Sequence, residues 1–130
     1  MTYQRTFSPK IPVKSFQDLE VYQKLLAISV AIAKRVKYEK VTAIALDLPV
    51  KTATAHSQRF GGQEKAIADL EQVMLNCNLL VVYLEQYRDI DNIDIEAEFF
   101  EEQIKSLLSV RMKILHLQNS WKKFAKDYAK

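Results

Sequence analysis

The residue types that most often carry catalysis or hold metal ions are few in this chain. His56 and His116 are its only histidines, and Cys77 is its only cysteine. Neither histidine has a glutamate three residues before or after it, so the Glu-x-x-His signature of a di-iron bundle is absent. The carboxylates of "IEAEFFEEQ" have no histidine close in sequence and are typical of a solvated acidic helix face. We therefore predict a protein that is not an enzyme and has no catalytic residue, metal or cofactor.

The single cysteine and the apolar pattern also bear on where the chain resides. One cysteine excludes an internal disulfide, and its setting, "MLNCNLL", predicts a small buried side chain rather than a reactive thiol. The first 14 residues contain no apolar stretch of the signal-peptide type. No uninterrupted apolar run approaches the roughly 20 residues that span a bilayer. A cytoplasmic location without membrane contact is the prediction.

Basic side chains are the remaining candidates for a functional site. The formal net charge of +3 conceals a sorting along the chain, because residues 1–60 carry +6, residues 61–109 carry −8 and residues 110–130 carry +5. Cations that gather in space bind nucleic-acid phosphates. The alternatives are solubility alone and pairing with acidic residues of a neighbouring subunit. The candidate phosphate-binding residues are Lys34, Arg35, Lys37, Lys40, Lys51, Arg59, Arg111, Lys122, Lys123 and Lys126.

One aromatic residue stands directly before two of these lysines. Trp121 precedes Lys122 and Lys123, and an indole beside cations is able to stack on bases. Packing in the core is the simpler interpretation of this tryptophan. In an antiparallel bundle the cluster around Lys122 would lie at one end and "KRVKYEK" at the other.

The elements that must position these cations are predicted to be helices. Glycine and proline total five residues, too few for a loop-rich β-fold. Pro9 and Pro12 set residues 1–14 apart as an extended basic arm, and residues 15–130 form one bundle domain.

The first helix is predicted to begin at a capping box formed by Ser15 and Asp18. It carries two apolar stripes, whereas one stripe suffices for packing within a monomer. The second stripe therefore favours a homo-oligomer. One stripe comprises Leu19, Tyr22, Leu26, Ala33 and Val36, with Ser29 at the missing step; the other comprises Val21, Leu25, Ile28 and Ile32.

The stretch "ALDLPVKTATAHSQRFGG" decides how many helices follow. Apolar and small residues keep helical phase through Pro49, so one helix kinked at Pro49 is preferred over two helices joined by a loop. Gly61 and Gly62 would then end it in a glycine C-cap or a turn.

The last two helices complete the fold class. The third shows the 3-4 spacing of a bundle seam, and the fourth runs from about residue 95 to 127. Four helices with short connections predict an all-α, up-down-up-down four-helix bundle. The seam is Ile67, Leu70, Met74, Cys77, Val81 and Leu84; the inner side of the last helix is Phe100, Ile104, Leu107, Leu108, Ile114, Leu115, Trp121 and Phe124.

Two segments resemble known bundle proteins. "SFQDLEVYQKLLAISVAIAKRVK" is similar to the opening helix of proteins encoded in intervening sequences of bacterial ribosomal RNA genes. "KAIADLEQVMLNCNLLVVYLEQYRDI" through "QNSWKKFAK" is more similar to the accessory variability determinant (Avd) proteins of diversity-generating retroelements. The likeness covers roughly residues 15 to 127. Residues 50–59, "VKTATAHSQR", lack the Asn-Ile-Ala-Glu-Gly stretch usual in the first group, and "LQNSW" lacks the glycines that often precede the tryptophan in the second.

The resemblance implies a homopentamer that binds RNA or DNA and, in the retroelement branch, partners a reverse transcriptase. A non-enzymatic, oligomeric nucleic-acid-binding accessory protein is therefore the first functional hypothesis. The alternative is a protein-binding scaffold or assembly factor that binds no nucleic acid. A small-molecule enzyme or metal-binding bundle is the third.

Overall fold

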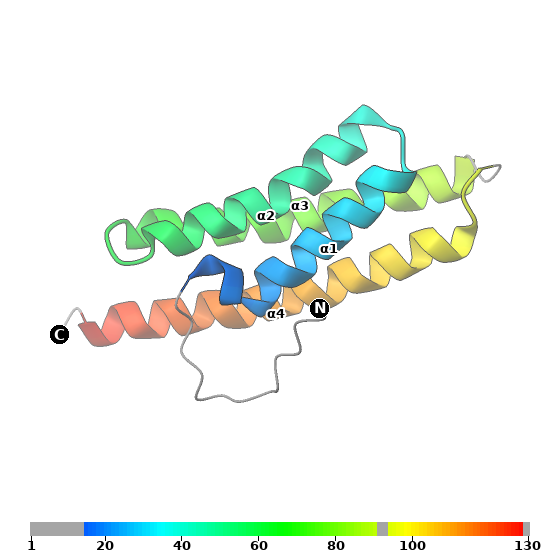
Figure 1. Ribbon diagram of the computed structural model, residues 1–130. Coiled ribbons are helices and arrows are strands. Elements are labelled where there is room, and N and C mark those ends of the chain that lie inside the picture. The colour runs from blue at the N-terminus through cyan, green and yellow to red at the C-terminus, as the bar shows by residue number, and fades with distance from the viewer. Residues whose placement is uncertain (1–14, 91–93, 129–130) are drawn as a thin grey trace.

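The computed structural model describes residues 15–90 and 94–128, with side chains as far as Phe124 in the last helix. The predicted arm at residues 1–14 lies outside this part of the chain. The described residues form a short 3-10 turn, η1 (Phe16–Asp18), and four helices. These are α1 (Glu20–Arg35), α2 (Glu39–Gln58), α3 (Gln63–Ile90) and α4 (Ala97–Tyr128). Each helix packs against the next and α1 also packs against α4, which confirms the up-down-up-down bundle (Figure 1).

The start of α1 differs from the prediction. The capping box is present, because Ser15 Oγ accepts a hydrogen bond from the Gln17 amide and Asp18 Oδ2 accepts one from the Ser15 amide. It caps η1 rather than α1, however, since Leu19 is extended and the helix begins at Glu20. The box therefore stabilises a turn that leads into the helix.

Helix α2 is continuous through Pro49, as the helical phase indicated. Proline has no amide hydrogen to donate, and Figure 1 shows α2 bending along its length. The small polar residues after the proline remain in the helix, and their hydroxyls donate to carbonyls four residues back, a type of bond that tends to bend a helix. These bonds run from Thr52 to Leu48, from Thr54 to Val50 and from Ser57 to Ala53.

The α2–α3 turn is not a left-handed glycine cap. Neither Gly61 nor Gly62 has a positive φ. The C-cap residue of α2, Arg59, is in the right-handed helical region. The Gly62 amide donates to the Gln58 carbonyl at 2.7 Å, and the Ala66 amide donates to the Gly62 carbonyl at 2.8 Å. The turn therefore follows from helix-like geometry and does not need the extra freedom of glycine.

The core confirms most of the seam. Leu70, Met74, Cys77, Val81 and Leu84 of α3 are all buried. On α4, Phe100, Leu107 and Ile114 are buried, whereas Leu108 and Phe124 are each 44% exposed and were wrongly assigned to the inner side.

One buried polar side chain fixes how α4 sits against α3. Gln118 is 1% exposed, and its Nε2 donates to the Ile67 carbonyl at 3.0 Å and lies 3.4 Å from Glu71 Oε1. A buried amide without partners would cost about 1–3 kcal/mol, so these contacts favour this register of the two helices.

The two stripes of α1 have different surroundings. Val21, Leu25, Ile28 and Ile32 form the face in the core. In the other stripe Leu19 and Val36 are buried and Tyr22 and Ala33 are half-buried, while Leu26 is 42% exposed. Tyr22, Leu26 and Ser29 of this stripe line an open groove between α1 and α2, of about 390 Å³.

Helix α3 is also apolar on its outer face. Leu75, Leu79 and Val82 are exposed at helical spacing. Among the described helices only α3 has the length and hydropathy that could cross a membrane, although the central helix of a bundle has the same properties. Here α3 packs against both α2 and α4.

Candidate nucleic-acid interface

The predicted cations are divided between the two ends of the bundle. Lys34, Arg35, Lys37 and Lys40 lie where α1 meets α2, which we call the α1–α2 end. Arg59, Lys122 and Lys123 lie where α2 meets α3 and α4 finishes, which we call the α2–α3 end. Helix α2 separates the two ends by about 30 Å, at 1.5 Å per residue. The ten candidates therefore do not form one surface.

Cations at the α1–α2 end face acidic residues. Arg35 forms a two-pronged ion pair with Glu96, with Nη1 2.9 Å from Oε1 and Nη2 2.8 Å from Oε2. The same guanidinium lies 4.7 Å from the centroid of the Phe99 ring. The bond to Arg35 is the main reason that the pKa of Glu96 falls to about 2. Arg35 is therefore occupied within its own chain.

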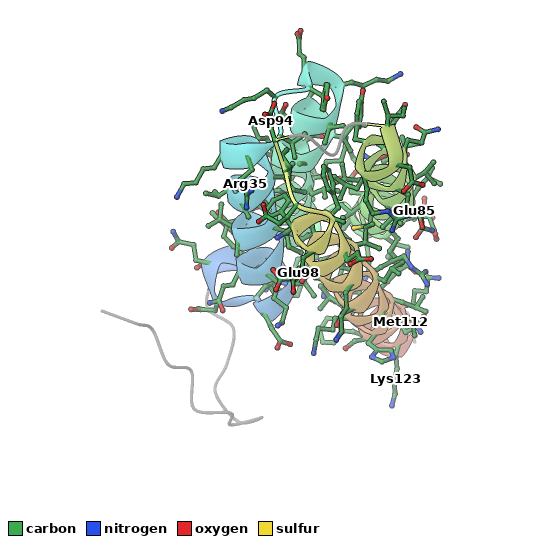
Figure 2. The ribbon with its side chains drawn as sticks, turned by 90° about the vertical axis from the view of Figure 1, so that its right-hand side faces the viewer. Arg35, Glu85, Asp94, Glu98, Met112 and Lys123 are labelled. Atoms are coloured by element: carbon green, nitrogen blue, oxygen red, sulfur yellow. The ribbon has the colours of Figure 1, made fainter. Side chains whose placement is uncertain are left out.

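The start of α4 places carboxylates beside the basic residues of the α1–α2 end. Figure 2 looks onto it and shows Arg35 near Asp94, with Glu98 on the neighbouring turn of α4. Lys40 Nζ lies 5.2 Å from the centroid of the Tyr83 ring, and a hydrogen bond to Tyr83 raises the pKa of Lys40. A phosphate approaching this end would meet carboxylates as well as cations, which weakens attraction.

Two candidates lie between the ends. Lys51 pairs with Asp47 one turn earlier on α2, at 3.6 Å. Arg111 is half-buried in the middle of α4, where its Nη2 lies 3.8 Å from Met112 Sδ and its buried Nε has no hydrogen-bond partner among the described residues. Neither side chain adds to a continuous basic surface at either end.

The α2–α3 end is built differently because α1 is short. Two ion pairs show the antiparallel register of α1 and α4, with Arg35 opposite Glu96 and Glu20 opposite Lys113 at 3.4 Å. Helix α1 begins at Glu20, and its first residues line a pocket with His116 and Leu117, so the part of α4 beyond about Leu117 has no α1 beside it. Figure 1 shows α2, α3 and α4 continuing past the start of α1.

An aromatic pocket occupies this uncovered region. It has a volume of about 200 Å³ and is lined by Arg59, Phe60, Gln63, Ser120, Trp121 and Phe124. The rings of Phe60 and Phe124 have centroids 6.1 Å apart, and the Trp121 ring lies 6.3 Å from that of His56. The turn after α2 therefore meets the last turns of α4 through aromatic contacts.

Arg59 is held at the mouth of this pocket. Its Nη1 donates to the His56 carbonyl at 2.7 Å and lies 3.2 Å from His56 Nδ1. Its guanidinium also lies 4.2 Å from the centroid of the Phe60 ring, as in a cation–π contact. No ion pair with a carboxylate involves Arg59 among the residues that the structure describes.

His56 is a buried neighbour of the pocket rather than a surface residue. It is 5% exposed, and burial is the main reason that its pKa is lowered. The positive charge of Arg59 lowers this pKa further, while Asp18 acts weakly in the opposite direction. His56 is therefore favoured in its neutral form.

Two exposed lysines complete the basic character of this end. Lys122 and Lys123 are exposed and, within the described part of the chain, form no ion pair. Lys65 adds a cation on the first turn of α3, where Glu64 is also exposed. Lys126 lies one turn further along α4, but its side chain is outside the described set. Cations are therefore in excess at this end.

Sequence reasoning missed most of the pocket. Phe60, Gln63, Ser120 and Phe124 were not among the predicted binding residues. Phe60 stands directly after Arg59 and before the two glycines, and an exposed aromatic residue in a turn was the available signal. Trp121 is half-buried against the core and also lines the pocket, so it contributes to both.

No built metal site accompanies the pocket. In residues 15–90 and 94–128, no three His, Cys, Asp or Glu side chains are grouped to hold a metal ion. Cys77 is 1% exposed, and burial raises its pKa to about 12, so it is a packed side chain as predicted. No protein-family model, curated protein or solved structure matches the chain.

Proposed function

We propose that the protein is a non-enzymatic, oligomeric accessory protein that binds nucleic acid at its α2–α3 end. The observation that supports this best is the combination of an aromatic pocket with Arg59, Lys122 and Lys123, which pair with no carboxylate among the described side chains. Phosphates supply most of the affinity in such complexes, and aromatic rings supply stacking. The resemblance of the later segments, "KAIADLEQVMLNCNLLVVYLEQYRDI" through "QNSWKKFAK", to Avd proteins agrees with this role and suggests a reverse transcriptase as a partner.

The oligomeric part of the proposal rests on two exposed apolar surfaces. The α1–α2 face carries Leu26, Val30, Leu46 and Val50, which are 42%, 39%, 46% and 59% exposed. The α3–α4 face carries Leu75, Leu79 and Val82 of α3 with Leu108 and Met112 of α4. Helix α1 packs on α2 and on α4 but not on α3, so these faces lie on opposite sides of the bundle. In Figure 2, Met112 projects on the side away from Arg35 and α1.

Two different apolar faces suit a head-to-tail assembly, in which one face of each copy packs on the other face of the next, and such an assembly forms a ring when the rotation between copies closes it. The charge sorting agrees, because the chain that forms α1 and α2 is basic and the chain that forms α3 is acidic. A homopentamer is the size that the resemblance to Avd proteins implies. Val50→Asp and Leu75→Asp change one residue on each face. Light scattering should show a multimer for the unchanged protein and smaller species for both variants, and a lone folded copy at micromolar concentration would refute the assembly.

Nucleic-acid binding is tested by fluorescence anisotropy of labelled single-stranded RNA and DNA across a range of salt. The variant Lys122→Glu/Lys123→Glu removes two cations at the α2–α3 end. Its matched control, Lys34→Glu/Lys37→Glu, makes the same change in net charge at the other end. The slope of log affinity against log salt should fall by about 1.4 for the first variant, at about 0.7 per contacted phosphate of a single strand. Equal effects of both variants, or no salt dependence at all, would overturn the proposal.

A protein-binding scaffold without nucleic-acid binding is the second candidate. The exposed apolar faces favour it, because faces of this kind serve contacts with any protein partner. Purified protein that assembles but does not bind RNA or DNA even at low salt would select this function over the first.

A further inference from the structure

The pocket at the α2–α3 end has the chemistry of a site for one planar ring system. Phe60 is 71% exposed and Phe124 is 44% exposed, so each offers part of its ring to a ligand. With Trp121 they form aromatic walls, and the pocket volume is about 200 Å³. Sites for drug-sized ligands start at roughly 300 Å³, so this pocket suits a smaller group.

The remaining lining residues are polar. Gln63 and Ser120 supply hydrogen-bond donors and acceptors, and Arg59 supplies donors fixed beside the Phe60 ring. An aliphatic or lipid ligand would leave these groups without partners. A flat ligand with polar edges satisfies them while its faces lie on the rings.

The surrounding charge defines what such a ring is attached to. Arg59 lines the pocket, and Lys122 and Lys123 are exposed at the same end of the bundle, so this charge favours a ring that is attached to anionic groups. A flat heteroaromatic ring joined to phosphates is a nucleobase. In a duplex both faces of a base are covered by its neighbours, whereas an unpaired base is free to stack on protein aromatic rings.

We propose that the pocket holds one unpaired base of a single-stranded nucleic acid, with Arg59 in the pocket wall contacting an adjoining phosphate and with Lys122 and Lys123 adding positive charge to the same end of the bundle. This inference rests on the proposed function and adds the substrate class, single strand rather than duplex. It also assigns Phe60 and Phe124 as the stacking residues.

Trp121 is the only tryptophan of the chain and lies in the pocket wall, so its fluorescence reports on occupancy. Three probes of equal length separate the contributions: a single-stranded oligonucleotide, the same strand with all bases removed, and a duplex. The single strand should change Trp121 fluorescence and bind about 5- to 150-fold more tightly than the abasic strand, as one stacked base contributes. The duplex should leave the fluorescence unchanged.

Phe60→Ala is the test variant, because a side chain this exposed contributes little to folding. Ile90→Ala is its matched control, since Ile90 is 78% exposed and lies at the other end of α3. Phe60→Ala should bring single-strand affinity to within about threefold of the abasic value, and Ile90→Ala should not change it.

The outcomes separate the two proposals. Salt-dependent binding that is equal for the base-bearing and abasic strands leaves the proposed function standing and overturns the base pocket. Absence of binding to any strand at low salt overturns the proposed function as well. A change in Trp121 fluorescence on addition of an aromatic peptide, with no change on addition of oligonucleotides, would overturn the base pocket and assign the pocket to a protein partner.

Discussion

Two adjacent leucines of α1 give a direct test of the fold and of the assembly. Leu25 is 0% exposed in the core, and Leu26 is 42% exposed in the α1–α2 groove. Replacing each in turn by alanine removes the same atoms from neighbouring positions of one helix. Any difference between the two variants therefore comes from their surroundings.

The expected magnitudes differ severalfold. Leu25→Ala leaves a core cavity and should lower the free energy of unfolding by about 2–5 kcal/mol. Leu26 is still partly exposed to water in the folded subunit, so its burial contributes less. Leu26→Ala should therefore lower the free energy of unfolding of a single subunit by about 1 kcal/mol or less. With a urea m-value of about 2 kcal/mol/M, these costs lower the midpoint by about 1–2.5 M and about 0.5 M or less.

Urea unfolding followed by circular dichroism at 222 nm measures both midpoints, at dilute protein so that assembly contributes least. Light scattering at higher concentration should show the reverse order, with Leu26→Ala weakening the oligomer more than Leu25→Ala does. Equal midpoints would refute the assignment of the two stripes. Unchanged assembly in Leu26→Ala would remove the α1–α2 face from the interface.

Three further predictions concern single positions. Cys77 should resist a thiol reagent in the native protein at pH 8 and react fully in denaturant, because burial raises its pKa; rapid native labelling would contradict its place in the core. Gly61→Ala should raise the free energy of unfolding by about 0.4–1 kcal/mol, since an added Cβ meets nothing within 4 Å and φ is not positive; a lowered thermal midpoint would count against the turn geometry. Burial lowers the pKa of His56 below its usual 6.5, so the unfolded chain binds the proton more readily, and stability should fall as pH drops below about 6.5. His56→Gln should flatten that decline in urea midpoints between pH 8 and 5.5, and an equally steep decline in the variant would exclude His56 as its source.

Local patterns predicted the helices well because each pattern has one simple structural solution. The seam around Cys77 could be assigned from 3-4 spacing alone, and continuous phase indicated that α2 passes through Pro49. The capping box at Ser15 was also correct as a set of hydrogen bonds. What it could not reveal was that the chain becomes extended at Leu19, because that depends on how the turn packs against α2.

The candidate site was predicted less completely. The positions of the basic residues could be read from the sequence. The residues that lie beside them in the fold depend on how the helices are aligned against one another. The approach of Glu96 to Arg35 joins residues 61 positions apart, and no local pattern encodes it. The pocket depends on the difference in length between α1 and α4, which places Phe60 beside Phe124. An aromatic residue beside an arginine was visible in the sequence, whereas its exposure and its partner across the turn were not.

The unequal lengths of α1 and α4 also give α4 two different local stabilities. Up to about Leu117 it lies beside both α1 and α3, whereas beyond that point α3 is the helix that packs on it, with ring contacts from His56 and Phe60. Local opening costs less free energy where fewer apolar contacts must be broken. Hydrogen–deuterium exchange should therefore proceed faster in the last turns of α4 than around Leu107, although both belong to one unbroken helix. The segment that bears the pocket is thus the part of the bundle most able to open and admit a ligand without unfolding the rest.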